Sequence, residues 1–222
     1  MKQNEQEIQF IKEEINQMWK MVISQLEKVK HSFINNDLDL AAEVIQTENK
    51  VNAFELKVDD SCENYIALYS PVAIDLRLVL SIMKISVTLE RIGDYAKGIA
   101  RHVKEENCGI FNTTVTEQLE IERMFDALLS MMTDSFAAFT NESSQHTGKI
   151  LSKDKEVNEI YHQSIRKLTD NVKVHPKEAH CILMMTILLR NMERIGDHCK
   201  NIVEEIVFYL EAKVLKHKGK TE

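Results

Sequence analysis

The sequence predicts an all-α protein built from two tandem three-helix bundles. Only 6 glycines and 2 prolines occur in 222 residues, so signals for strands and turns are few, while 44% hydrophobic and 28% charged residues suit amphipathic helices. Apolar residues recur at steps of three and four along most of the chain, as on the buried face of a helix. A five-residue sequence also occurs twice, about half the chain apart, which indicates an internal duplication.

The repeated sequence is Glu-Arg-Ile-Gly-Asp, at residues 90–94 and again at residues 193–197. The two copies are 103 residues apart, and a lysine follows the aspartate by three residues in both. A match of this length at this distance is improbable by chance. We therefore divide the chain into a first unit at residues 1–110 and a second unit at residues 111–222.

The first unit is expected to contain three long helices, at residues 5–34, 38–68 and 71–106. The second of them has apolar residues every seven positions from Val44 to Tyr65, and Trp19 of the first is expected to be a packing residue. Residues 35–37, Asn-Asn-Asp, separate the first two helices. Ser70 is expected to cap the third helix, with Pro71 at its first helical position.

The second unit repeats this arrangement with helices at residues 115–140, 144–174 and 176–216. Residues 107–114 interrupt the helical pattern and form the expected boundary between the units. Thr114 and Glu117 have the spacing of a capping box. Pro176 is expected to open the last helix.

The repeated sequence places two carboxylates close together on a helix. Glu90 and Asp94 are four residues apart, so they project from the same face and repel each other, which weakens a helix by a few tenths of a kcal/mol. Gly93, between them, costs about 1 kcal/mol relative to alanine in a helix interior. A bound cation would explain the carboxylate pair, and close approach of another backbone or a ligand would explain the glycine.

Preceding helices supply matching polar pairs. Glu48 and Asn52 are four residues apart in the first unit, and Asp154 and Asn158 correspond to them in the second. If the second and third helices of each unit pack side by side, four oxygen-bearing residues converge, a set that suits Fe³⁺, Mn²⁺, Mg²⁺ or Zn²⁺. The candidate metal ligands are Glu48, Asn52, Glu90, Asp94, Asp154, Asn158, Glu193 and Asp197.

A simpler interpretation of the repeated carboxylates is a ladder of solvated ion pairs. Arg91 precedes Asp94 by three residues and Lys97 follows it by three, and the second copy has the same arrangement. Such pairs stabilise a helix without any metal. The duplication and the paired glycines favour a functional site over this alternative.

Composition and charge exclude other classes of protein. A net charge of −7 without a basic stripe does not resemble a nucleic-acid-binding surface. The four cysteines have no CxxC spacing, so free thiols in a reducing compartment are expected. No export signal or membrane-spanning stretch is found, and a cytoplasmic location is expected.

Taken together, residues 71–77 (Pro-Val-Ala-Ile-Asp-Leu-Arg), 90–96 and 192–202 resemble the PhoU family of phosphate-transport regulators. The resemblance implies two three-helix bundles related by pseudo-two-fold symmetry, polynuclear iron or zinc sites, and no catalysis. It adds Asn201, four residues after the second motif aspartate, to the metal-site residues. It also implies a homodimer that links the ATPase subunit of the phosphate transporter to a sensor histidine kinase and represses the starvation response when phosphate is plentiful. Any membrane location would come through these partners.

The chain departs from the family pattern at several positions. Gly98 stands where the first unit would have the asparagine, and Asn52 and Asn158 stand where many members carry a carboxylate. The second unit lacks the Asp-x-Arg element, having Glu-Ala-His-Cys at residues 178–181 nearby. These changes reduce the negative charge around the expected metal sites.

An alternative function is a di-metal carboxylate enzyme of the ferritin-like class. That class requires two Glu-x-x-His units and two further glutamates on four helices. This chain has one such unit, at residues 159–162, and it does not lie on the helices of the repeated sequence. No glycine-rich phosphate loop or nucleophile motif occurs either, so a regulatory role is favoured over an enzyme.

Overall fold

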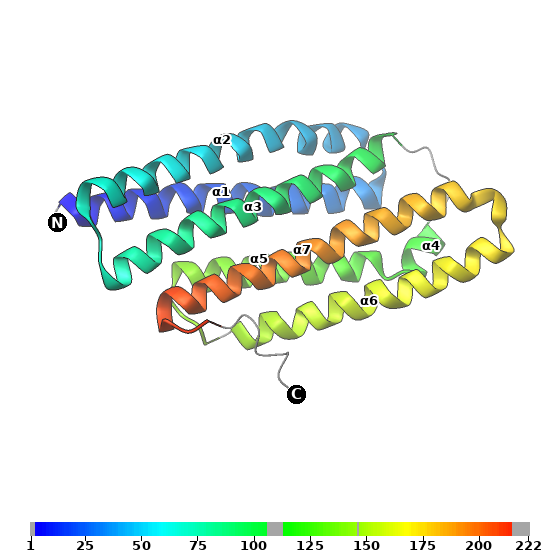
Figure 1. Cartoon of the computed structure of the whole chain (residues 1–222). Coiled ribbons are helices and arrows are strands. Elements are labelled where there is room, and N and C mark those ends of the chain that lie inside the picture. The colour runs from blue at the N-terminus through cyan, green and yellow to red at the C-terminus, as the bar shows by residue number, and fades with distance from the viewer. Residues whose placement is uncertain (1–2, 106–112, 146, 215–222) are drawn as a thin grey trace.

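The structure is a computed structural model that describes residues 3–105, 113–145 and 147–214 (Figure 1). No strand occurs within these ranges, and the predicted all-α class is confirmed. The helices, in chain order, are α1 (Gln3–Asn35), α2 (Leu38–Tyr69), α3 (Ala73–Glu105), α4 (Thr113–Gln118), α5 (Ile121–Thr140), α6 (Thr147–Val174), the 3₁₀ helix η1 (Pro176–Glu178) and α7 (Ala179–Glu211).

Helices α1, α2 and α3 pack together as one bundle, and α5, α6 and α7 as a second. The bundles lie side by side, with α3 against α7 and α1 against α5 (Figure 1). Each of these contacts joins helices that correspond in the two bundles, as pseudo-two-fold symmetry requires. Helices α3 and α7 run antiparallel, since Arg77 at the start of α3 bonds the carbonyl of Tyr209 near the end of α7.

The core extends across the contact between the bundles. Trp19 of α1 is fully buried, and its ring centroid lies 5.7 Å from that of Phe136 and 5.6 Å from that of Phe139, both on α5. The packing role predicted for Trp19 is therefore confirmed. The seven-residue pattern of α2 is buried as well, from Val44 to Tyr65.

The turn between α2 and α3 differs from the prediction. Ser70 is not the N-cap of α3: it ends α2 in the left-handed conformation (φ 46°), and its N–H donates to the carbonyl of Ile66. Pro71 consequently lies in the connection, and α3 begins at Ala73. A Ser-Pro pair fits the end of one helix as well as the start of the next, so sequence alone could not separate the two.

Helix boundaries in the second bundle also differ from the prediction. The helix expected at residues 115–140 is broken at Glu120, whose φ is 53° and whose N–H donates to the carbonyl of Glu117. The next helix begins at Thr147 rather than at residue 144, and the last ends at Glu211 rather than at residue 216. The boundary expected at residues 107–114 lies mostly outside the described residues, and the division at residue 110 stays a prediction.

The expectation of four free cysteines is wrong for Cys181, which is disulfide-bonded. Cys62 and Cys199 are free and buried, as expected, and Cys108 lies outside the described residues. Burial, with smaller contributions from nearby carboxylates, raises the pKa of the Cys62 thiol to about 12. This cysteine is therefore a packing residue rather than a reactive thiolate.

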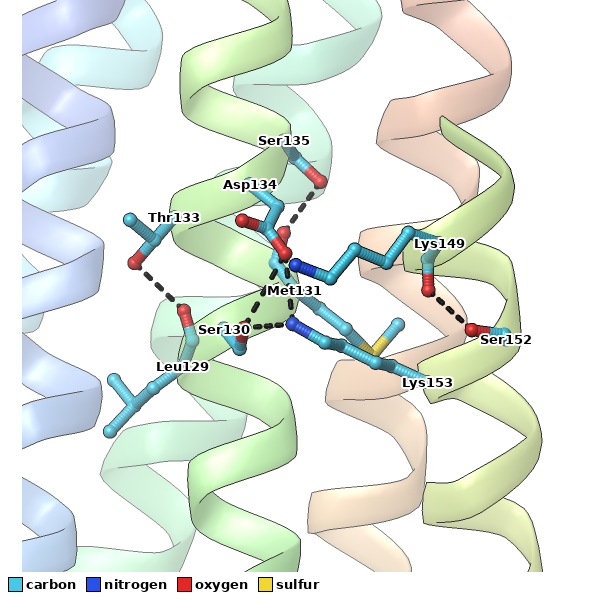
Figure 2. Close-up of polar contacts among 9 residues, drawn as sticks. All are labelled: Leu129, Ser130, Met131, Thr133, Asp134, Ser135, Lys149, Ser152 and Lys153. Carbon is cyan, nitrogen blue, oxygen red and sulfur yellow. Dashed lines mark hydrogen bonds and ion pairs between the residues drawn. The ribbon is translucent and has the colours of Figure 1, made fainter. Parts of the chain in front are cut away.

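A polar cluster joins α5 to α6 on the second bundle (Figure 2). The Lys153 ammonium lies 2.8 Å from Asp134 Oδ2 and also donates to the hydroxyl of Ser130. Burial alone would raise the pKa of Asp134, but the hydrogen bond and the charge of Lys153 lower it overall, and Lys149 adds to this. The pair therefore stabilises the contact between the two helices while Asp134 is ionised.

Candidate metal centre

Helices α2 and α3 bring three predicted ligands together in the first bundle. The carboxylates of Glu48, Glu90 and Asp94 each offer an oxygen atom within 4.8 Å of the others. They lie beside the buried apolar stripes of both helices, and Glu48 is only 4% exposed. The predicted convergence of the second and third helices is thus present in this bundle.

The three carboxylates differ in their electrostatic environments. Burial and the charges of Asp94 and Glu55 raise the pKa of Glu90. Burial would also raise the pKa of Glu48, but hydrogen bonds from Lys97 and Asn52 lower it overall. The Asn52 amide donates to Glu48 Oε1 at 2.7 Å, so this predicted supporter positions a ligand.

Lys97 already supplies a cation to this group. Its ammonium lies 2.7 Å from Glu48 Oε2 and 3.7 Å from Asp94 Oδ1. The sequence predicted only the contact with Asp94, because a three-residue spacing on one helix does not reveal a partner on another helix. The ion-pair alternative is therefore partly realised, and a metal ion bound to Glu48 would compete with this ammonium.

The corresponding group in the second bundle contains two buried oxygen atoms that accept no hydrogen bond. Asp154 Oδ1 on α6 and Glu193 Oε2 on α7 are both buried without a hydrogen-bond partner. Burial raises the pKa of both carboxyl groups, and the charge of Asp197 adds to the increase. Buried acceptors without a hydrogen-bond partner are rare in folded proteins, so these two oxygen atoms fit the ligands of a cation.

This second group is less compact than the first. In the part of the chain that the structure describes, its three carboxylates do not reach the mutual distance of 4.8 Å seen in the first bundle. Arg194 lies 3.0 Å from Asp197 Oδ2, and its Nε lies 3.6 Å from Glu193 Oε2. The Asn158 amide donates to Asp154 Oδ2 at 3.5 Å.

Asn201 is partly buried on α7, one turn after Asp197, and makes no hydrogen bond to this group among the described residues. Asn52 and Asn158 thus donate to the carboxylates, and the role of Asn201 stays a prediction.

The two motif glycines permit the helices that carry the carboxylates to approach each other. A Cβ at Gly93 would lie 3.1 Å from Gln25 Oε1 and 3.5 Å from Val51, and one at Gly196 would lie 3.3 Å from Val157. Val51 and Val157 belong to the corresponding helices α2 and α6. Close helix packing thus explains both glycines, without a ligand contact of their own.

The donor set fits a divalent cation. It contains only oxygen atoms, which hard and borderline cations prefer, and Glu90, Asp154 and Glu193 all have raised pKa values that a bound cation would reverse. When bound, such an ion would neutralise carboxylates that otherwise repel one another.

Comparison with known proteins identifies the family. A family model described as "PhoU domain" matches residues 15–103 and 121–206, most of the chain. The chain belongs to the PhoU family. The two matched ranges lie on α1–α3 and on α5–α7, so each bundle is one PhoU repeat and contains one of the carboxylate groups.

Relatives and solved structures agree with this assignment. The chain is 32% identical over 216 residues, 97% of this chain and 88% of the relative, to the "Phosphate-specific transport system accessory protein PhoU" of Escherichia coli K12. It is 31% identical over 213 residues, 96% and 86%, to the protein of the same name from Edwardsiella tarda. The crystal structure of PhoU from Pseudomonas aeruginosa superposes with a TM-score of 0.87 at 26% identity, covering 95% of this chain and all of that one.

A second PhoU crystal structure, from Streptococcus pneumoniae, has a TM-score of 0.85 at 24% identity, covering 96% of this chain and 99% of that one, and supports the fold. Of the helices described for this PhoU-family chain, none is both long enough and apolar enough to cross a membrane.

Proposed function

We propose that this PhoU-family protein is an accessory and regulatory component of phosphate-specific transport and acts through binding rather than catalysis. The observation that supports this most is the match of both bundles to the PhoU domain, together with relatives named as accessory proteins of that transport system. The proposed location is the cytoplasm, and the proposed assembly is a homodimer.

The ferritin-like alternative has little support in the arrangement of side chains. Glu159 and His162, the two ends of the single Glu-x-x-His unit, are both exposed on α6. Neither belongs to the carboxylate group formed by Glu48, Glu90 and Asp94. A di-metal enzyme would need such residues to project into the bundle.

The proposed metal sites are the two carboxylate groups, one in each repeat. Glu48, Glu90 and Asp94 would hold an ion in the first, supported by Asn52. In the second, Asp154, Glu193 and Asp197 would hold one, with Asn158 and Asn201 as supporters. Iron and zinc are the ions that the family resemblance suggests. Elemental analysis of the purified protein, with and without chelator, tests this proposal directly.

The proposed partners are the ATPase subunit of a phosphate transporter and a sensor histidine kinase, at the cytoplasmic face of the membrane. Binding to both would allow the protein to repress the starvation response when phosphate is plentiful. Cation binding would change the charge of the carboxylate surfaces, and it would alter partner binding only if partners distinguish the two states.

A deletion strain tests the regulatory role. In high phosphate, deletion is expected to switch starvation genes on, and the full-length chain is expected to restore repression. If the two carboxylate groups act in signalling, replacing Glu90 and Glu193 together by glutamine should prevent the chain from restoring repression. Glu63→Gln, which changes an exposed residue of α2, should leave restoration intact. If starvation genes stay silent in the deletion strain, and neither partner is recovered in pull-downs, the proposal is rejected.

A further inference from the structure

A cavity of about 600 Å³ lies between α3 and α7, beside the first carboxylate group. Helix α3 contributes Arg91, Lys97 and Arg101 to its lining, and α7 contributes Asn191 and His198. These side chains come from corresponding helices of the two repeats, so the cavity exists only because the bundles pack against each other.

The cavity collects positive charge in an acidic protein. Three cationic side chains and one carboxylate, Asp94, line it. With Lys97 counted as paired with Glu48, the remaining lining has a formal charge of +1 with neutral histidine, while the whole chain has −7. Arg91 and Arg101 are exposed, and neither is within ion-pair distance of a carboxylate among the described residues. Their guanidinium groups are therefore available to an anion, and guanidinium binds phosphate oxygens in pairs.

The corresponding surface on the other side of the pseudo-two-fold axis has a different character. The 103-residue offset places Glu204 where the cavity has Arg101, which reverses a charge. It also places Arg194 where the cavity has Arg91, and Arg194 is held by Asp197 at 3.0 Å. Of the arginines at these corresponding positions, the two without a carboxylate partner therefore both lie on one side of the axis.

Gly98 leaves space at this side of the interface for the side-chain amide of Asn191. A Cβ at Gly98 would lie 3.0 Å from Asn191 Nδ2, so the glycine leaves space for the amide that lines the cavity. The second repeat has Asn201 at this position. Gly98, which departs from the family pattern, therefore lies on the same side of the axis as Arg91 and Arg101.

We propose that this cavity is a binding site for a dianionic oxyanion of the phosphate class. Arg91 and Arg101 are its main ligands, and the Asn191 amide is a neutral donor. Lys97 lies at its edge and remains paired with Glu48. The site goes beyond the proposed regulatory function and requires neither that function nor a bound metal.

Calorimetric titration of the chelator-treated full-length protein with inorganic phosphate, at constant ionic strength and a pH above neutrality, tests the site. Saturable binding is expected. Arg91→Ala and Arg101→Ala should each weaken it by roughly tenfold or more, because each removes charge-assisted hydrogen bonds. Arg166→Ala is the matched control, since Arg166 is exposed on α6, and it should bind phosphate as the unaltered protein does.

Circular dichroism of each variant establishes that the helices are intact. Asn191→Leu, which removes a donor without changing charge, should also weaken binding. The inference is overturned if phosphate shows only heats of dilution, or if Arg166→Ala weakens binding as much as Arg101→Ala does. A protein that binds phosphate as expected but fails to restore repression would support this site and reject the proposed function.

Discussion

Tyr95 and His198 stack across the interface between the bundles, with ring centroids 5.6 Å apart and an interplanar angle of 29°. They are also corresponding residues, since 103 positions separate them as they separate the two motif copies. Two corresponding residues can touch only where they meet the symmetry axis, so the pseudo-two-fold axis passes between these rings. Burial lowers the pKa of His198, and Arg91 lowers it further, so the ring is neutral near pH 7.

Removing Lys97 should destabilise the metal-free protein. Lys97→Met would leave Glu48, which is 4% exposed, without its cation, and about 2–4 kcal/mol of unfolding free energy should be lost. Lys104→Met, an exposed change on the same helix, should alter stability by less than about 0.5 kcal/mol. Urea denaturation with chelator present measures both. Equal effects of the two variants would contradict the role given to Lys97.

Removing a repelling carboxylate should stabilise the metal-free protein. The raised pKa of Glu90 means that its ionised form is disfavoured in the folded state, so stability should rise as pH falls through the folded pKa toward the unfolded value. Glu90→Gln should abolish that part of the pH dependence and add a few tenths of a kcal/mol at pH 7. Thermal unfolding over a pH series with chelator is the measurement. A lower melting temperature in the variant at pH 7 would show that the carboxylate stabilises the fold.

A bound divalent cation should raise the melting temperature. At about one hundred times its dissociation constant, a ligand that binds only the folded state adds about 2.7 kcal/mol. Asp94→Asn combined with Asp197→Asn should remove most of this gain, because each repeat loses one ligand. Thermal unfolding with and without Mn²⁺ or Zn²⁺, compared with Glu63→Gln, measures it. Unchanged metal content in the double variant would remove these ligand assignments.

The motif glycine of the second repeat should be sensitive to a single added methyl group. Alanine would gain about 1 kcal/mol in helix propensity at Gly196, but its Cβ would lie 3.3 Å from Val157, and overpacking typically costs 1–3 kcal/mol. Gly196→Ala should therefore be neutral or destabilising. A Cβ at Gly148 would meet no atom within 4 Å, so Gly148→Ala should stabilise the folded protein by about 0.5–1 kcal/mol. Chemical denaturation measures the stability of both variants. A clear gain in stability for Gly196→Ala would show that α6 and α7 move apart at no cost to accept the added methyl group.

The pair between Lys153 and Asp134 should give an acid-sensitive contribution. Because the pKa of Asp134 is lowered in the folded state, its contribution is present above the unfolded pKa and is lost as pH falls through the folded pKa. Lys153→Met should lower stability by about 0.5–1.5 kcal/mol at pH 7 and have less effect in acid. Lys173→Met, which breaks an exposed pair with Asp170, should have an effect near zero. A loss at Lys153 that does not vary with pH would show that only its packing contributes.

The sequence predicted site residues that are neighbours on one helix or that occur at corresponding positions in the two repeats. Glu90 and Asp94 followed from the duplication, and Glu48 from the match between the two preceding helices. Contacts that depend on the distance between helices were not predicted. Lys97 has an aspartate three residues before it, which concealed its stronger contact with Glu48 on α2.

Local conformations that contradict residue preference were also missed. Glu120 adopts a positive φ that is uncommon outside glycine and asparagine, so nothing in the sequence marked the break before α5. The group around Asp154 has an aspartate where the first group has Glu48, a difference that the sequence shows. The sequence did not show that Arg194 lies 3.0 Å from Asp197 and 3.6 Å from Glu193.

The stacking of Tyr95 on His198 has a consequence for the origin of the chain. A single repeat with the same α3 surface would have met a copy of itself there, as an isologous pair in which every substitution occurs twice. Gene fusion removes that constraint, because each copy then mutates separately. Arg101 and Glu204, which occupy corresponding positions with opposite charges, are a difference that two identical subunits cannot have. Joining the repeats in one polypeptide is therefore what allowed the two sides of the axis to specialise.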